Sequence, residues 1–470
     1  MLCADFECAP DVVAVMGRTG GLRGRFVLEN VFAGKAIVGA EPFLTLTSKD
    51  GLTALEQAGS RRILPGDPFE ALRLVLGRYA GEPVPDVPFA GGAVGYFSYD
   101  LGRVIERVPV IAQEDVPTPD YCLGFYDSAL IIDSARAKCT AVSWSGDKRA
   151  VDLWREIARD AAEVSQGGYS VRRGSPRPAG RGSTKSADAF SGIRSNFTPA
   201  GYLRAIERVK QYIAAGDCYQ VNLSQRFDAE LSSQPWKLYE ALRRINPAPH
   251  SCFIEIGEPA LVSASPESFL SYDPATRIVI TRPIKGTRPR GASAEEDARL
   301  AAELAASEKD RAENLMIVDM ERNDLGRVAR YGSVRVPKLW EIEAHPNVFQ
   351  MVSTVEAELA EDRDQIDLLR AAFPGGSITG APKVRAMEII EELEPHRRGI
   401  YTGSAGFIDF GGRMELNIVI RSFVVHSGRV YFHAGGGIVA DSVPEMEYQE
   451  TLDKVSGLVA ALDEVRRQDG

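Results

Sequence analysis

The chain has 470 residues, of which 44% are hydrophobic and 26% charged, a composition typical of a globular protein with a large core. Its 65 acidic residues outnumber its 55 lysines and arginines and give a net charge of −10. This charge argues against a general nucleic-acid binder, because such proteins neutralise phosphates with basic residues. No membrane-length apolar stretch, secretory signal pattern or C-x-x-C pair is found, so we expect a cytoplasmic protein with free thiols and no membrane partner.

Composition changes sharply between residues 165 and 195, where glycine, serine, proline and arginine dominate. Such a segment predicts a flexible linker or loop. We therefore divide the chain into an N-terminal β-rich region (1–164), the linker (165–195) and a C-terminal region (196–470). The two regions are expected to pack as one unit.

Short β-rich runs alternate with turn residues before the linker, and longer strands and helices follow it. In the N-terminal region, strands are predicted over 26–28, 36–38, 43–46, 91–97 and 128–132, and a helix over 68–79. In the C-terminal region, helices are predicted over 198–215, 293–320, 365–372 and 380–394 and from 442 onward. Strands are predicted there over 218–227, 251–256, 260–263, 278–281, 334–336, 350–358, 403–409, 414–425 and 429–433. Because strands and helices come in groups, we predict the α+β class, with antiparallel sheets covered by helices.

The most informative motif is a lysine flanked by a proline and a glycine, just after the strand predicted over 278–281. Lys285 stands between Pro283 and Gly286, which restrict the backbone and allow a close approach. An exposed solubilising lysine needs no such frame, whereas a lysine that must reach a substrate does. Taken alone, however, the motif is more often a strand-ending turn than a nucleophile.

Two pairs of carboxylates add a possible metal site. Asp310 with Glu313, and Glu447 with Glu450, are each spaced i, i+3, which places both members on one face of a helix. A solvated helix face is the ordinary interpretation of one such pair. Two pairs together offer the hard oxygen ligands that suit Mg²⁺, and the five isolated histidines offer no zinc site.

The start of the last helix is well specified. Ser442 and Glu445 have the spacing of a capping box. Lys454 follows Glu450 by one turn, on the same face.

Two glycine-rich segments predict anion binding. Gly435, Gly436 and Gly437 follow a predicted strand and are expected to offer bare backbone N–H groups. The segment 375–383 opens a predicted helix, whose N-terminus favours negative charge. It lacks the Gly-Lys-Ser/Thr of a phosphate loop, so nucleotide binding is not expected.

Taken together, these motifs resemble the chorismate-utilising enzymes over nearly the whole chain. The resemblance is carried by residues 216–224, 265–267, 313–327, 373–391 and 434–454, and more loosely by 28–29 and 91–100. It implies an anthranilate synthase component I-like fold, with antiparallel β-sheets packed as a sandwich and helices on the outer faces. It also implies that the N-terminal region can hold a tryptophan-type effector site.

Two positions favour the aminodeoxychorismate branch of this family. Anthranilate-forming relatives carry alanine at the position of Lys285, and hydroxylating relatives carry a water-activating lysine at the position of Gln220. Gln350 stands where many relatives have a histidine linked to pyruvate elimination, which fits a product that keeps its enolpyruvyl group. Anthranilate synthesis and a catalytically silent chorismate-binding subunit remain the alternatives.

The resemblance also implies roles for fourteen residues. Lys285 is the expected covalent nucleophile and Glu267 the general acid. Mg²⁺ is expected on Glu313 and Glu450, with Asp310 and Glu447 in support. The expected substrate-binding residues are Thr287, Ser377, Tyr401, Arg421, Gly435, Gly436, Gly437 and Lys454. Chorismate is the expected substrate, 4-amino-4-deoxychorismate for 4-aminobenzoate and folate synthesis the product, and a separate glutaminase subunit the ammonia source.

Overall fold

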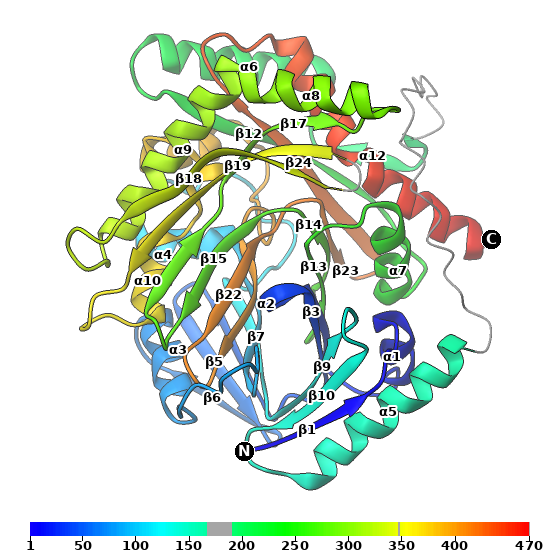
Figure 1. Ribbon diagram of the computed structural model, residues 1–470. Helices are drawn as coiled ribbons and strands as arrows, with labels where there is room; N and C mark the ends of the chain where they lie inside the picture. Colours follow the sequence, from blue (N-terminus) through cyan, green and yellow to red (C-terminus); the bar gives the residue numbers. More distant parts are fainter. Residues whose placement is uncertain (167–189, 346–347, 470) are drawn as a thin grey trace.

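Two large antiparallel β-sheets form the centre of the molecule, and helices cover their outer faces (Figure 1). The computed structural model describes residues 1–166, 190–345 and 348–469. The architecture confirms the predicted α+β sandwich. Most of the predicted linker, residues 167–189, lies outside the described residues, and the division into regions stays a prediction. At its margins the chain is still regular, with α5 ending at Gln166 and β11 covering Ile193–Ser195.

Each sheet mixes strands from the two halves of the chain. The first sheet runs in the order β1 (Leu2–Glu7), β10 (Lys138–Ser143), β9 (Ser128–Asp133), β3 (Lys35–Gly39), β2 (Arg25–Asn30), β13 (His250–Glu255), β14 (Ala260–Ser265), β23 (Ser422–His426), β24 (Arg429–Ile438), β12 (Gln220–Glu230) and β11, with β20 (Gly380–Ala381) beside β12. The second runs in the order β17 (Ile284–Pro289), β19 (Val348–Glu358), β16 (Ile278–Thr281), β15 (Ser268–Asp273), β22 (Met414–Ile418), β21 (Ser404–Asp409), β7 (Gly92–Phe97), β8 (Tyr121–Tyr126), β4 (Leu44–Lys49), β5 (Leu52–Gln57) and β6 (Ser60–Leu64), with β18 (Arg335–Ala344) beside β19. The N-terminal strands are therefore integral to both sheets.

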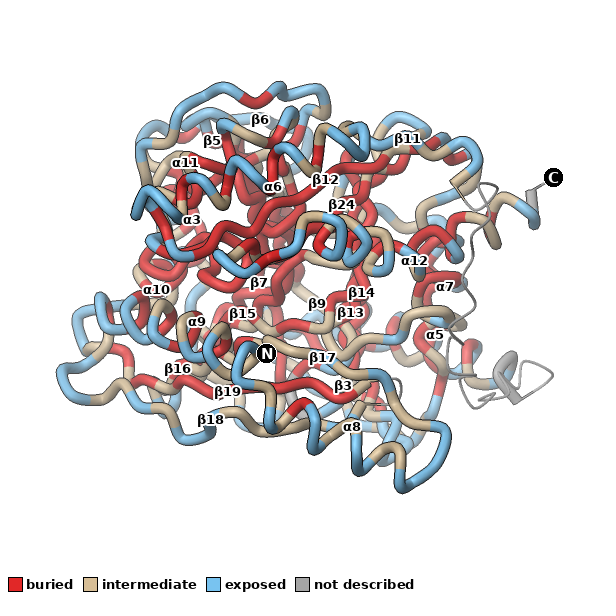
Figure 2. The backbone as a smooth tube through the Cα atoms, turned by 90° about the horizontal axis from the view of Figure 1, so that it is seen from above, coloured by how far each residue is buried: buried red, intermediate tan, exposed pale blue. Residues whose placement is uncertain are grey.

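Three layers of apolar side chains hold the sandwich together. One packs the first sheet against α1 (Val12–Arg18), α5 (Lys148–Gln166), α7 (Pro235–Ile245) and α12 (Pro444–Asp469). A second packs the other sheet against α3 (Pro68–Gly77), α9 (Glu308–Gly326) and α10 (Gln365–Ala372). The third lies between the sheets and joins β2, β3, β13 and β14 to β7 and β21. Figure 2 shows the result, buried central strands within a more exposed periphery.

Five further helices complete the described part of the fold: α2 (Val31–Gly34), α4 (Gly102–Ile105), α6 (Pro199–Ala214), α8 (Ala294–Ala306) and α11 (Lys383–Leu393). Of these, α6 and α8 lie near the top of Figure 1. Within the described residues, every helix is too short or too polar to cross a bilayer. All six cysteines are free, as the sequence predicted.

Three predicted elements differ from the structure for local reasons. The helix predicted over 293–320 is two helices, because the Ser307 side chain accepts a hydrogen bond from the Asp310 amide and starts α9. The strand predicted over 414–425 is interrupted at Arg421, whose φ of 53° lies in the left-handed region. The helix predicted from residue 380 begins at Lys383, since Gly380 and the next residue instead pair with β12.

Candidate active site

A cavity of about 440 Å³ lies where β12 and β24 of the first sheet approach β17 and β19 of the second. Helices α9 and α12 contribute the rest of its polar wall. All fourteen residues proposed from the sequence line it: Lys285, Glu267, Thr287, Ser377, Tyr401, Arg421, Gly435, Gly436, Gly437, Lys454, Glu313, Glu450, Asp310 and Glu447. The structure brings these residues together, while their roles stay predictions.

Lys285 lies in a β-bulge rather than in a turn. Strand β17 pairs with β19 at Ile284 and again at Thr287, and the register shifts between them. Bulges re-aim side chains, and this one directs Lys285 toward α9. Gly286 permits the bulge, since its φ is 82° and a Cβ there would lie 2.8 Å from the Asp310 carboxyl carbon. The Lys285 Nζ is 3.9 Å from Glu313 Oε2, and both side chains are largely buried.

Glu267 occupies the tight connection between β14 and β15. Its amide donates to the Ser265 hydroxyl at 3.2 Å, and its carbonyl accepts from the Ile418 amide at 3.0 Å. Burial raises the pKa of its carboxyl to about 7, while Ser377 and Lys285 act in the opposite direction. The carboxyl can therefore carry a proton near neutral pH.

Four carboxylates face the cavity from two helices. Burial raises the pKa of Glu313 on α9, and the nearby charges of Asp310 and Glu447 raise it further against the effect of Lys285. Asp310 accepts from Arg288 at 3.2 Å, and Glu447 on α12 accepts from the Ser442 hydroxyl at 2.8 Å. The two pairs therefore lie within electrostatic reach of each other.

Glu450 completes this set and pairs with Lys454. The two side chains are 2.5 Å apart, and Lys454 also donates to the Gly435 carbonyl at 2.8 Å. Lys454 holds the pKa of the Glu450 carboxyl below its ordinary value despite burial. Burial in turn lowers the pKa of Lys454.

The donor chemistry of this set suits a hard divalent cation. Across residues 1–166, 190–345 and 348–469, no three acidic, histidine or cysteine side chains converge closely enough to form a complete metal cage. Mg²⁺ does not need one, because it commonly uses one or two carboxylates and completes its octahedron with water and substrate oxygens. Mutual repulsion among the four carboxylates, of which Glu447 is buried, Asp310 and Glu313 are half-buried and Glu450 is exposed, would also be relieved by a cation.

The same cavity carries donors for an anion. Arg421 lies beside Tyr401 and Glu450, and burial lowers its pKa. In the described parts of the chain, no hydrogen bond or ion pair engages its guanidinium. Burial raises the pKa of Tyr401 to about 12, so its hydroxyl stays a neutral donor. A carboxylate of a ligand would satisfy both groups.

The glycine run differs from its prediction, because Gly435, Gly436 and Gly437 lie within β24 and do not follow it. They pair with β12 on one edge, while β23 pairs with β24 only as far as Phe432. The opposite edge is thus unpaired beside the cavity. A Cβ at Gly436 would lie 3.2 Å from the Glu447 carboxylate, so a side chain there would crowd the carboxylates.

The predicted capping box at the start of α12 is also different. The helix begins at Pro444, and the Ser442 hydroxyl bonds to Glu447 instead of taking part in a box with Glu445. The same hydroxyl accepts from the Val439 amide at 3.1 Å. Ser442 therefore orients a cavity carboxylate.

Sequence reasoning did not propose several other lining residues. His433 stacks on Tyr401, with ring centroids 4.5 Å apart, and burial lowers its pKa well below the ordinary value. Asn222 and Lys309 also face the cavity, as does Gln350, which the sequence had singled out for its place in the family and not as a lining residue. Lys309 follows Glu308 at the start of α9, one helical turn before Glu313, which was the available signal for it.

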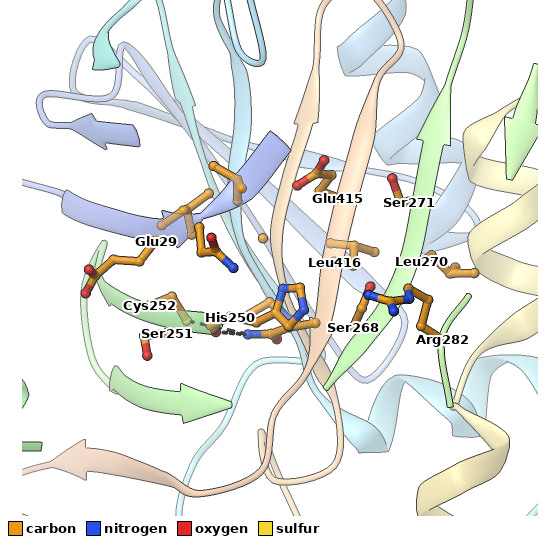
Figure 3. A pocket seen from close by; sticks show the side chains of 16 residues that line it. Glu29, His250, Ser251, Cys252, Ser268, Leu270, Ser271, Arg282, Glu415 and Leu416 are labelled. Carbon is orange, nitrogen blue, oxygen red and sulfur yellow. Dashed lines mark hydrogen bonds between the residues drawn. The ribbon is translucent and has the colours of Figure 1, made fainter. Parts of the chain in front are cut away.

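A second cavity, of about 280 Å³, opens between the two sheets (Figure 3). Glu29 lies at one side and Arg282 at the other, with His250 between them. Burial lowers the pKa of His250 to about 4, and its carbonyl accepts from Asn417 at 2.9 Å. Arg282 stands three residues before Lys285, so the chain segment between them joins the two cavities.

Comparisons with known proteins agree with this geometry. A family model described as chorismate binding enzyme matches residues 24–460. The aminodeoxychorismate synthase component 1 of Escherichia coli is 45% identical over 429 residues, covering 91% of this chain and 89% of that protein. The anthranilate synthase component 1 of Thermus thermophilus is 41% identical over 447 residues, covering 93% and 92%. The anthranilate synthase component I structure from Streptococcus pneumoniae matches with a TM-score of 0.75 at 30% identity, covering 90% of this chain and 92% of that chain.

Proposed function

The chain belongs to the chorismate-binding enzyme family, and we propose that it is the component 1 subunit of an aminodeoxychorismate synthase. A relative named aminodeoxychorismate synthase and one named anthranilate synthase both share more than 40% identity with it, so overall similarity does not separate the two activities. The observation that carries the proposal is Lys285, a mostly buried amine in one cavity with Glu267 and Glu313. Anthranilate-forming relatives have alanine at this position, by the resemblance stated above.

Chorismate has two carboxylates, and the cavity contains both cationic groups and a set of carboxylates that can hold a cation. The first carboxylate would bind Arg421 and Tyr401 beside the unpaired edge of β24. Glu313 and Glu450, with Asp310 and Glu447 in support, would hold Mg²⁺ near the second carboxylate. When bound, Mg²⁺ supplies charge neutralisation for the ring carboxylate.

The chemical step would use Lys285 as a nucleophile. Its neutral amine attacks C2, the ring double bonds shift, and the C4–O bond breaks as Glu267 gives its proton to the departing hydroxyl. Ammonia then forms the C4–N bond, the double bonds shift back, and the C2–N bond to Lys285 breaks. Two successive displacements place the amino group on the carbon that carried the hydroxyl.

Ammonia would come from a separate glutaminase subunit. The Escherichia coli relative is named component 1, which implies a second component. Every cysteine of this chain is free, and the cavity contains none, so glutamine hydrolysis is assigned to the partner.

The test is an incubation of the purified chain with chorismate, Mg²⁺ and an ammonium salt, with products identified by mass spectrometry. We expect a non-aromatic aminated chorismate that disappears when a chelator is added. Anthranilate as the product would mean that the chain is an anthranilate synthase component. Binding of chorismate without turnover would favour a catalytically silent subunit.

Lys285→Ala is the matching variant. We expect a loss of amination that a small added amine partly restores. Full activity of this variant without such an amine would exclude the covalent step.

A further inference from the structure

The backbone around Lys285 is not fixed by its own strand. Between Ile284 and Thr287 the pairing of β17 with β19 shifts register, so Lys285 and Gly286 stand outside the regular ladder. A side chain on a bulge can take several directions unless neighbouring groups hold the backbone. The structure supplies these groups just before the lysine.

Two buried residues, Asn314 and Ser353, hold the Pro283 carbonyl, and we call the two residues and this carbonyl the buried bracket. The carbonyl accepts from the Ser353 amide at 3.1 Å and from the Asn314 side chain at 3.5 Å. The Ser353 hydroxyl donates to the Asn314 side-chain oxygen and accepts from the Trp340 amide at 3.0 Å. Both polar side chains are 0% exposed.

The buried bracket joins the expected nucleophile to the helix that carries the carboxylates. Asn314 immediately follows Glu313 on α9, and Ser353 lies on β19, the neighbour of β17. Farther along α9, Glu321 accepts from the Thr281 hydroxyl at 3.1 Å, just before the Pro283 segment begins. One helix therefore holds both the carboxylate and, at two points, the chain that leads to Lys285.

Apolar side chains of similar size would fill this space without the cost of desolvating an amide and a hydroxyl. The polar side chains of Asn314 and Ser353 are explained if their directional hydrogen bonds fix the backbone at Pro283. We propose that Asn314 is a positioning residue that acts through Ser353 and Pro283 to hold the Lys285 amine in register with Glu313. The proposal rests on the proposed function for its catalytic consequence, though not for the geometry.

The experiment compares Asn314→Leu, Ser353→Ala and the double variant in the full-length chain. Each single variant leaves a buried partner unsatisfied and lowers the unfolding temperature, whereas the double removes both partners and recovers much of it. In all three we expect kcat to fall on the order of 10- to 100-fold, because a misplacement of about 1 Å can cost roughly 100-fold. The KM for chorismate should stay within about twofold of the wild-type value, because the variants leave Arg421 and Tyr401 unchanged.

A second readout does not depend on turnover. Reductive methylation with formaldehyde and cyanoborohydride, followed by peptide mass spectrometry, measures the reactivity of Lys285 relative to Lys454. We expect this ratio to change severalfold in the double variant. Ser404→Ala is the matched control, since Ser404 is 0% exposed and its hydroxyl donates to the Asn417 carbonyl at 2.6 Å, outside the active cavity. It should lose stability and keep both kcat and the methylation ratio.

The outcomes separate the two proposals. A double variant with unchanged kcat and unchanged methylation ratio would overturn the positioning role. A kcat that recovers together with stability in the double variant would do the same, because it would make the bracket structural only. A wild-type chain that never aminates chorismate, but whose methylation ratio shifts in the variants, would overturn the proposed function and leave the positioning of Lys285 supported.

Discussion

Glu267 shows how one buried carboxyl obtains a pKa suited to acid catalysis. Its side chain is 7% exposed, and the loss of hydration raises its pKa from 4.5 to about 7. Lys285 and Lys454 lower it and so prevent a larger shift. A carboxyl with this pKa is protonated in half of the molecules at neutral pH, which is the condition for a general acid.

We expect the amination rate to depend on this proton. At a fixed concentration of free ammonia, the ratio of wild-type to Glu267→Gln kcat/KM for chorismate should be highest below pH 7 and fall about tenfold per pH unit above it, since only protonated Glu267 can act and the nucleophile is the same in both chains. Glu267→Gln should reduce the rate by roughly 10²- to 10⁴-fold. A ratio that is constant from pH 6 to about pH 9 would contradict this role.

The same shift predicts a pH-dependent stability. Because the pKa of Glu267 is raised in the folded chain, its contribution to stability is complete below about pH 4.5 and is lost as the pH rises through about 7. Glu267→Gln removes this dependence. Its free energy of unfolding relative to the wild type should therefore increase between pH 5 and 8, by at most about 3 kcal/mol. Urea titrations at these two pH values measure the difference, and an equal difference at both would contradict the assignment.

The sequence predicted the members of the site better than their arrangement. Resemblance identified Lys285 and Glu267, because motifs identify positions whatever their surroundings. It did not reveal that Lys285 lies in a bulge, or that Asn314 holds the segment before it. Those features depend on contacts between residues far apart in the chain, such as Asn314 with Ser353, and no local pattern encodes them.

At the scale of single elements, a residue that precedes helix α12 also orients a carboxylate of the cavity. Ser442 precedes the helix, and its hydroxyl bonds Glu447 at 2.8 Å while its carbonyl accepts from Lys210 of α6 at 2.6 Å. This places Glu447 opposite the carboxylates of α9. The Ser442 contact thus links the position of one helix end to the expected metal site.

Ser442→Ala should weaken Mg²⁺ use rather than chorismate binding. Without the hydroxyl, Glu447 loses its fixed orientation, and we expect the Mg²⁺ concentration for half-maximal activity to rise about 10- to 100-fold. Ser456→Ala is the control, since Ser456 lies on the same helix and its exposed hydroxyl donates to the Asp453 carbonyl at 2.7 Å, away from the cavity carboxylates. An equal Mg²⁺ requirement in both variants would contradict the role of Ser442.

Strands with a clear local pattern were easier to predict than strands without one, and one helix with a clear pattern was missed. Strand β4 alternates buried and half-buried residues, and its prediction from the sequence is confirmed. Strand β6 is mostly exposed, so no hydrophobic alternation marked it, and β17 has the sequence of a turn. Helix α7 went unpredicted although its buried Trp236, Tyr239 and Leu242 have helical spacing, which was a usable signal.

At the scale of the whole molecule, the two halves of the chain complete one another's sheets. Strand β2 pairs with β13 through the first sheet, and β7 pairs with β21 through the second. The apolar layer between the sheets also draws on both halves. Separation of the halves would therefore expose two unpaired strand edges and an apolar face.

This topology predicts how the chain behaves when it is divided at the predicted linker. Residues 196–470 carry every proposed site residue, yet we expect this fragment alone to aggregate, because β13 and β21 lose their partners. Coexpressed with residues 1–164, it should form a folded complex that purifies as one species, since the pairings β2–β13 and β7–β21 can form between fragments. Size-exclusion chromatography and thermal unfolding measure both outcomes. A C-terminal fragment that folds and turns over chorismate by itself would show that the N-terminal strands are dispensable, contrary to their place inside both sheets.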